Sequence, residues 1–228
     1  MRAVKVNGYK IKPEANLSGA NLKDANLKDA NLRSADLRSA DLSRANLAYA
    51  DLEGANLYGV NLYEAYLHEA NLRSADLEGA DLIRADLIRA NLRSADLMGA
   101  KLEGANLSGA DLTGADLTGA DLTGAKLWGV HLKGANLKGA SFKGANLSEA
   151  IFSSANLARA DLNGADLYGA NLAYADLEGA NLREADLQGA NFEEANLSGA
   201  DLEDARGDRQ TTWPEGFNSA RAGVNLFF

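Results

Sequence analysis

One five-residue unit is repeated without interruption over most of the 228 residues of this chain. From residue 15 to residue 204 the first position of the unit is Ala, except at Val60 and Val130. The third position is Leu, except at Phe142, Phe152 and Phe192, and the second is Asp or Asn in all but six units. The unit therefore reads A-[DN]-L-x-x. Such a period indicates one continuous body that grows by stacking rather than separate domains.

Apolar residues alternate at spacings of two and three along this repeat, which fits neither a single helix nor a long strand. On an α-helix, which advances about 100° per residue, successive Leu side chains would point about 140° apart and form no apolar stripe. On an extended strand, the odd period would send successive Leu side chains to opposite faces. The backbone must therefore turn once in every unit, so that each Ala and each Leu faces one interior axis.

The last two positions of the unit supply this turn. The fifth residue is Gly in every unit from Gly99 to Gly144, and glycine accepts the positive φ that many tight turns require. Elsewhere this position is often Ser, Asp, Glu, Arg or Tyr. The difference predicts a second turn geometry, with changes of turn type near Gly99 and near Glu149.

Longer-range repeats predict four units in each coil. The string N-L-R-S-A-D recurs at Asn31, Asn71 and Asn91, so its copies are separated by multiples of four units. At a spacing of four units, charges of alternating sign also follow one another along the fifth position: Asp24, Arg44, Glu64 and Arg84. Opposite charges on adjacent parallel strands stabilise the pairing by about 0.2–1 kcal/mol per pair.

The repeat A-[DN]-L-x-x over residues 15–204 resembles that of the pentapeptide repeat family. The resemblance implies an all-β fold, a right-handed quadrilateral parallel β-helix with four units per coil and with Leu, Phe and Ala pointing inward. The 38 units would then make about 9.5 coils. At about 4.8 Å between stacked strands, the rod would be roughly 45 Å long.

Each end of such a solenoid exposes open strand edges, so we expect a cap at both. Residues 1–14 are predicted as an N-terminal cap with a short hairpin, because apolar residues alternate around the turn-forming pair Asn7-Gly8. Residues 205–228 are predicted as a C-terminal capping tail. Its large apolar residues are Trp213, Phe217, Val224, Leu226, Phe227 and Phe228.

The W-P-E-G-F stretch at Trp213–Phe217 is similar to tails of pentapeptide repeat proteins that are abundant in photosynthetic bacteria. A bare Leu core needs covering, so we interpret the tail as a lid. The alternative is that the tail makes a dimer contact, so we expect either a monomer or an end-to-end dimer.

Charge and composition narrow the classes of partner. The formal net charge is −9, and the repeat carries 29 acidic and 16 basic residues. An acidic rod repels nucleic-acid backbones and anionic membranes and attracts a basic partner. Cysteine is absent, the first residues lack the apolar run of a signal peptide, and no 18-residue apolar stretch is present. We therefore expect a cytoplasmic protein that contacts neither membrane nor nucleic acid.

The sequence offers little catalytic chemistry. In the four-sided register, His68 and His131 lie on different sides and about 14 Å apart along the axis, too far for one ligand set or proton relay. The Asp side chains stand on outward ridges, without the burial that acid–base catalysis requires. We therefore expect no enzyme, no catalytic residues, no cofactor and no metal. The tripeptide Arg206-Gly207-Asp208 has the letters of an integrin-binding motif and is interpreted as coincidence.

The outward positions are where binding would be encoded. The register stacks Tyr63 on Ile83 along one side and His68 on Ile88 along the next. An apolar cluster on an otherwise polar rod predicts a protein-contact patch, and neutral drift on a tolerant scaffold is the competing interpretation. The candidate residues are Tyr58, Tyr63, Tyr66, His68, Ile83, Ile88 and Met98. Farther along, Trp128 lies in a basic belt, which we interpret as a solvated face.

Two functional hypotheses of different classes remain. The first is a non-enzymatic scaffold or protein-binding solenoid, because a filled core leaves no cavity for a small molecule. The second follows from the family resemblance, since some relatives protect DNA gyrase by imitating the size and charge of duplex DNA. An acidic rod of this kind would bind gyrase or another basic DNA-binding protein.

Overall fold

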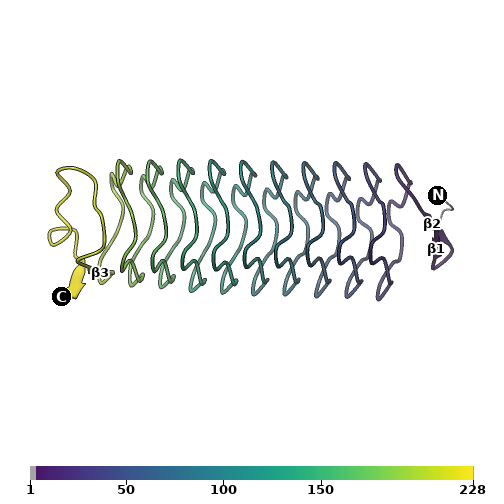
Figure 1. Cartoon of the computed structure of the whole chain (residues 1–228), viewed down its shortest axis with the longest axis horizontal. Helices are drawn as coiled ribbons and strands as arrows, with labels where there is room; N and C mark the ends of the chain where they lie inside the picture. Colours follow the sequence, from purple (N-terminus) through teal and green to yellow (C-terminus); the bar gives the residue numbers. More distant parts are fainter. Residues whose placement is uncertain (1–3, 228) are drawn as a thin grey trace.

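The computed structural model describes residues 4–227; residues 1–3 of the predicted N-terminal cap and Phe228 of the tail lie outside the described residues. Figure 1 shows a straight rod of stacked coils, with a hairpin at the N-terminal end and the tail at the other. Residues 4–227 contain no helix. The strands are β1 (Val4–Val6), β2 (Tyr9–Ile11), β3 (Arg206–Asp208) and β4 (Asn225–Phe227).

Between β2 and β3, units bridge in parallel to units four places away, on both sides in the middle of the rod and on one side in its first and last coils. Asn16 pairs with Asp36, for example, and Asp36 pairs with Asn56. Backbone hydrogen bonds accompany each bridge: the N–H of Leu17 donates to the C=O of Asp36 at 2.7 Å. This constant offset confirms four units per coil. The fold is a right-handed quadrilateral parallel β-helix, with the hand that parallel connections nearly always take.

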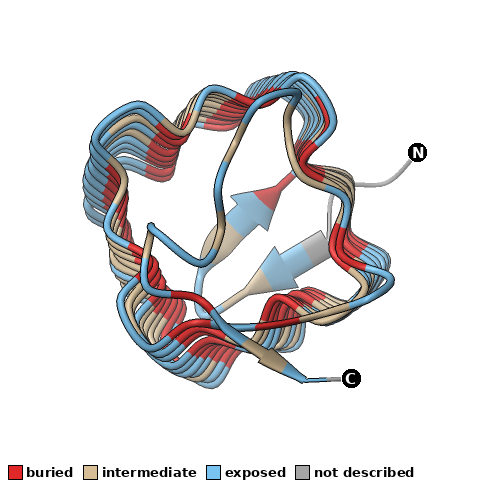
Figure 2. Ribbon diagram, turned by 90° about the vertical axis from the view of Figure 1, so that its left-hand side faces the viewer, coloured by how far each residue is buried: buried red, intermediate tan, exposed pale blue. Residues whose placement is uncertain are grey.

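The first and third residues of the unit fill the interior. Figure 2, seen from the C-terminal end, shows buried residues along the inner wall of the coils and exposed residues at their corners. Leu107 has no exposed surface, and Phe142 contacts Phe152 edge to face at 6.3 Å between ring centroids. Each buried Leu contributes roughly 1.5–3 kcal/mol, so the core alone explains why this period folds.

Each corner is a turn that hydrogen bonds close in the same way. The N–H of Ala20 donates to the C=O of Leu17 at 3.0 Å, and later units repeat this bond. The fifth residue has a positive φ in every unit from Gly19 to Asp204, between 52° and 69°.

The predicted change of turn geometry is therefore wrong. The φ is 56° at Arg84, 61° at Gly99 and 59° at Glu149, whatever the side chain. The reason is the stacking of coils, because the fifth residue also donates its N–H to the coil above. Arg84 donates to Glu103 and Gly104 donates to Thr123, both at 3.0 Å. A coil with a different turn would lose these bonds.

The second residue of the unit stabilises the turn that follows it. Every Asp or Asn at this position accepts, through Oδ1, a hydrogen bond from the backbone N–H two residues later, at 2.9–3.4 Å. This contact is the Asx turn that short polar side chains favour. It explains why Asp and Asn recur although neither is buried in the core.

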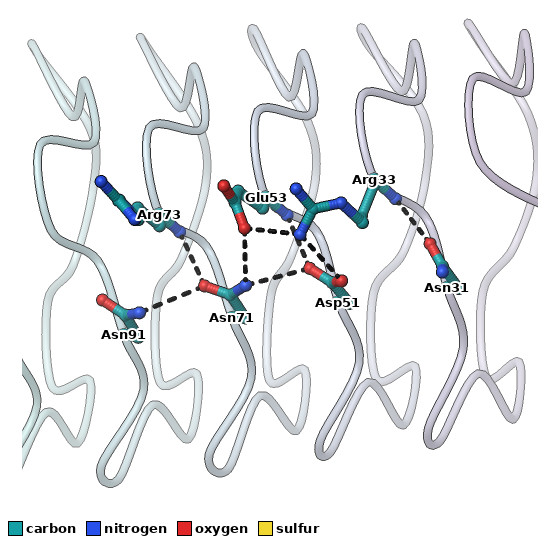
Figure 3. Close-up of polar contacts among 7 residues, drawn as sticks. All are labelled: Asn31, Arg33, Asp51, Glu53, Asn71, Arg73 and Asn91. Carbon is teal, nitrogen blue, oxygen red and sulfur yellow. Dashed lines mark hydrogen bonds and ion pairs between the residues drawn. The ribbon is translucent and has the colours of Figure 1, made fainter.

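Some of these side chains also bond to one another from coil to coil. In the column drawn in Figure 3, the amide of Asn71 donates to Asp51 at 3.0 Å and the amide of Asn91 donates to Asn71 at 3.2 Å. Arg33 donates to Asp51 at 3.2 Å and to Glu53 at 2.5 Å. Such polar ladders add contacts between coils on the outer surface.

At the N-terminal end, β1 and β2 form an antiparallel hairpin in which Val6 faces Tyr9. Its turn residues Asn7 and Gly8 both have positive φ, 49° and 85°, as a two-residue type I′ turn requires. Ile11 is buried against the first coil, and the N–H of Asn21 donates to the hydroxyl of Tyr9 at 3.3 Å.

At the C-terminal end, parallel stacking continues past residue 204, because Arg206 in β3 pairs with Asp186 and β4 pairs with β3 in turn. Gly207 occupies the position where the repeat would place Leu, and Trp213, Val224 and Leu226 fill that space. Trp213 stacks on buried Phe192 at 5.1 Å and on Phe217 at 5.2 Å, so the tail crosses the open core.

Candidate protein-contact surface

Five of the seven predicted patch residues lie on one side of the rod. Tyr63 stacks on Ile83 at one corner and His68 stacks on Ile88 at the next corner. In each pair, the N–H of the following residue donates to the C=O one coil above, at 3.0 Å. Tyr66 lies on the side between these corners and is 56% exposed.

The structure places Tyr58 and Met98 apart from this group, at a third corner. Their positions in the four-unit coil differ from those of His68 and Tyr66, and Glu78 separates them along the column. Both are exposed. Their corner joins the two sides that carry most of the aspartates.

The surroundings of His68 include a residue that sequence reasoning missed. The ring of Tyr49 meets the imidazole edge to face at 5.6 Å, and Lys28 Nζ lies 5.5 Å from the centroid of the Tyr49 ring. His68 Nε2 lies 3.3 Å from Glu69, which also lies 3.9 Å from Arg89. Tyr49 is one residue out of the column of His68, one coil earlier, so the register alone places the two residues near each other but not their rings in contact.

Two more exposed aromatic residues continue this corner. Trp128 and Tyr168 fall in the column of His68 and Ile88, and both are about half exposed. Sequence reasoning assigned Trp128 to a basic belt and did not single out Tyr168. Counting in steps of four units from His68 would have found both.

The two acidic sides that meet at the corner of Tyr58 and Met98 carry carboxylates stacked in register. Asp76 bridges to Asp96 and Asp96 bridges to Asp116. Burial raises the pKa of Asp116, but hydrogen bonds from the hydroxyl and N–H of Thr118 outweigh it, so this pKa is lowered. Ligand atoms of Asp76, Glu78 and Asp96 lie within 4.8 Å of one another. Nothing besides their proximity points to a cation, so we assign no metal there.

His68 and His131 lie in different columns, so the structure does not bring the two histidines together. A shallow hollow of about 480 Å³ lies beside the hairpin, lined by Asn7, Tyr9, Asn21, Lys23 and Asp24. Its open form and exposed lining give no dry environment for catalysis.

The Arg206-Gly207-Asp208 tripeptide has a structural explanation. Arg206 forms an ion pair with the coil below at 3.2 Å, and Gly207 is buried beneath the tail. Asp208 accepts the N–H of Gly189 at 3.0 Å, and this bond is the main cause of its lowered pKa. Asp208 also accepts the hydroxyl of Thr211 at 3.0 Å. The three residues therefore tie the tail to the last coil.

Comparisons with known proteins agree with this architecture. The family model described as pentapeptide repeats matches overlapping segments that together span residues 14–204. HetL, a pentapeptide repeat protein involved in heterocyst differentiation regulation from the cyanobacterium Nostoc sp. strain PCC 7120, is 41% identical with a TM-score of 0.64. That match covers 90% of this chain and 92% of HetL.

A second solved structure shares the fold alone. QnrB1, a plasmid-mediated fluoroquinolone resistance protein, is 20% identical with a TM-score of 0.54, covering 78% of this chain and 84% of QnrB1. Among curated proteins, no sequence match was found. Within residues 4–227, the structure has no helix long and apolar enough to cross a membrane.

Proposed function

The chain belongs to the pentapeptide repeat family, and from this membership we propose that it is a non-enzymatic solenoid that binds another protein along its outer surface. The filled core supports this proposal, because stacked Leu and Ala side chains leave no interior site for a substrate. The outward positions vary far more between coils than the inward ones, which are Leu and Ala in nearly every unit. Recognition would therefore be encoded in the columns at the corners and sides.

The observation that carries the proposal is the side formed by Tyr63, Tyr66, His68, Ile83 and Ile88. Aromatic and aliphatic groups gather there within two neighbouring coils; Tyr66 is exposed, and the other four are half-buried. A cluster of apolar groups that reaches the surface is typical of protein contacts, and Tyr is enriched among residues that dominate binding energy. The similarity to HetL, a protein involved in regulation, also supports a binding role rather than an enzymatic one.

A pull-down from native lysate tests this function. The bait is the full chain, and the variant carries Tyr63→Ala, His68→Ala, Ile83→Ala and Ile88→Ala. A matched control carries Tyr174→Ala, which removes an exposed aromatic residue at another corner. We expect a specific partner to be retained by the wild type and the control and lost from the patch variant. Equal recovery by all three baits would contradict the patch.

A second candidate function is an acidic mimic of duplex DNA that binds gyrase or another basic DNA-binding protein. The stacked aspartates Asp76, Asp96 and Asp116, with a second acidic column on the neighbouring side, favour it. A gyrase supercoiling assay with and without a fluoroquinolone discriminates the two functions. No effect at micromolar protein would exclude the gyrase-directed mimic, whereas protection that Asp96→Asn and Asp116→Asn abolish would support it.

A further inference from the structure

Five residues form a straight row along one corner of the rod, which we call the corner row: Ile88, Ser108, Trp128, Ser148 and Tyr168. Taken in coil order, they alternate between large and small side chains. Each lies directly above the one before, because the residue following each donates its N–H to the C=O of the next, at 2.8–3.0 Å. Trp128 and Tyr168 are each 52% exposed.

The alternation gives this corner a regular series of protruding and recessed positions. Within the row, large side chains recur every second coil, about 9.6 Å apart at the usual spacing between strands. The alternation is confined to these five coils, because His68 precedes Ile88 and Gln188 follows Tyr168 in the same column. The serines form notches between them. The hydroxyl of Ser108 donates to Asn106 at 2.7 Å, and the hydroxyl of Ser148 donates to Asn146. These bonds hold both side chains against their own units, which keeps the notches open.

One common ligand conformation has almost the same repeat. A polyproline II helix has three residues per turn and rises about 3.1 Å per residue, so every third side chain faces the same way at about 9.3 Å. Over the two intervals from Ile88 to Tyr168, the mismatch is only about 0.6 Å. We propose that the corner row binds a proline-rich segment of a protein in the polyproline II conformation. This inference rests on the proposed protein-binding function and names the class of partner.

The exposed groups suit this ligand. Polyproline II segments have no internal hydrogen bonds, so their carbonyl groups accept bonds from Trp N–H and Tyr O–H donors. Proline rings pack against aromatic faces, which is how aromatic-lined surfaces recognise such segments. Trp128 stands between the two notches and is the central contact.

Charge at one end adds a further requirement on the partner. Glu149 and Asp166 flank Tyr168, and among the described residues neither forms an ion pair. A Lys or Arg next to the proline run would pair with them. A neutral glycan could stack on the same rings but would make no use of these carboxylates, so the charge favours a peptide.

Isothermal titration of the full chain with a synthetic peptide tests the proposal. The peptide has about 12 residues, four polyproline II turns, with proline at every third position and arginine at one end. The comparison peptide has the same composition with the prolines at irregular spacing. We expect the periodic peptide to bind and Trp128→Ala to weaken it about tenfold or more, as for a central aromatic contact.

Two further variants separate contact from shape. Ser148→Tyr fills a notch without removing any aromatic residue, and we expect it to weaken the periodic peptide by a similar factor. Tyr174→Ala, at another corner, should leave binding unchanged. Circular dichroism of each variant verifies that the coils remain folded.

The proposal is overturned if neither peptide binds, if both bind equally, or if a soluble β-glucan binds in place of the periodic peptide. Its failure is distinct from failure of the proposed function. A lysate partner captured equally by the wild type and by Trp128→Ala, without binding of the periodic peptide, would keep the protein-binding function and overturn the corner row as its site.

Discussion

The fifth residue of each unit is where the backbone departs furthest from ordinary geometry. Left-handed φ costs an L-residue roughly 1–2 kcal/mol relative to its usual conformation, and glycine avoids this cost. Arg, Glu, Ser and Tyr nevertheless adopt it in many units, for example at Ser74 with a φ of 53°. The stacking bonds and the Leu core outweigh the local strain.

Two substitutions measure that strain from opposite directions. Gly119 has a φ of 66°, and a Cβ added there would meet nothing within 4 Å, so Gly119→Ala changes only the backbone preference. We expect it to lower the free energy of unfolding by about 1 kcal/mol. Ser74→Gly should leave stability unchanged or raise it by up to about 1 kcal/mol, because relief of strain is partly offset by unfolded-state entropy.

Urea denaturation at equilibrium gives both values, with Lys133→Ala at an exposed fourth position as the control. Full stability of Gly119→Ala would show that the strain lies elsewhere in the unit.

The aspartates of the second position make stability depend on pH. Burial acts to raise the pKa of Asp111, but hydrogen bonds from Thr113 outweigh it and lower this pKa, and Asp116 behaves alike with Thr118. A carboxyl whose folded pKa lies below its unfolded value stabilises the fold above the unfolded pKa. This contribution is lost as pH falls through the folded pKa.

We therefore expect the melting temperature to be flat from neutral pH down to about 4.5 and to fall below about pH 4, near the ordinary pKa of Asp. In the variant Asp111→Asn with Asp116→Asn, the fall should be smaller. If the melting temperature of this variant falls as steeply in acid as that of the wild type, other carboxyls cause the fall.

Among the elements, the two ends show how far the sequence could be interpreted. The hairpin had a local signal, because Asn7 and Gly8 readily adopt the positive φ of a two-residue turn and alternating apolar residues flank them. The core had a strong signal, because a five-residue period allows Leu side chains one interior only. The place of Gly207 had no local signal, because the side chains that fill its space come from the irregular tail, at Trp213, Val224 and Leu226.

The candidate patch shows the same division. The four-unit register was sufficient to stack Tyr63 on Ile83 and His68 on Ile88. The same register separates Tyr58 from these residues, but its proximity in sequence led us to include it in the patch. The contact of Tyr49 with His68 depends on side-chain directions at a corner, which a period alone does not determine.

The tail offers a test of its role as a lid. In Gly207→Leu, the repeat regains its usual residue, but a Cβ at this position would already lie 3.3 Å from Val224 and 3.4 Å from Trp213. We expect the larger side chain to displace the tail, to cost about 1–3 kcal/mol as overpacking does, and to expose the core to association. Light scattering after size-exclusion chromatography would detect the association.

Phe227→Ala is the matched change at the other surface of the tail, where Phe227 is 53% exposed. If the tail is a lid, this variant stays as stable and as monomeric as the wild type. If the tail is a dimer contact, the wild type is dimeric and Phe227→Ala dissociates it, which would contradict the lid.

In the whole molecule, the core and the outer surface carry different information. All four sides bury mainly Leu and Ala, with Phe at three inward positions and Val at two, so the interior barely distinguishes one unit from another. The outer columns depend on the number of units, because adding or removing one unit moves every later residue to the neighbouring side of the rod. Fold and recognition can therefore be separated by deleting whole units.

Deletion of residues 131–135, one unit between Trp128 and Ser148, makes use of this separation. The remaining Leu and Ala side chains still stack, but Ser148 and Tyr168 move to the neighbouring corner and the corner row is cut. Deletion of residues 176–180 also removes one unit but lies beyond Tyr168, so the row stays intact. We expect both proteins to melt within a few degrees of each other, since each loses the same buried groups.

Titration with the periodic proline-rich peptide then distinguishes them. The protein without residues 176–180 should bind like the wild type, whereas the protein without residues 131–135 should lose most of its affinity because Trp128 and Tyr168 no longer share a corner. Equal binding by the two deletions would mean that Trp128 acts alone or that the ligand lies elsewhere. A large loss of stability in either would mean that the outer ladders, rather than the uniform core, hold the coils in register.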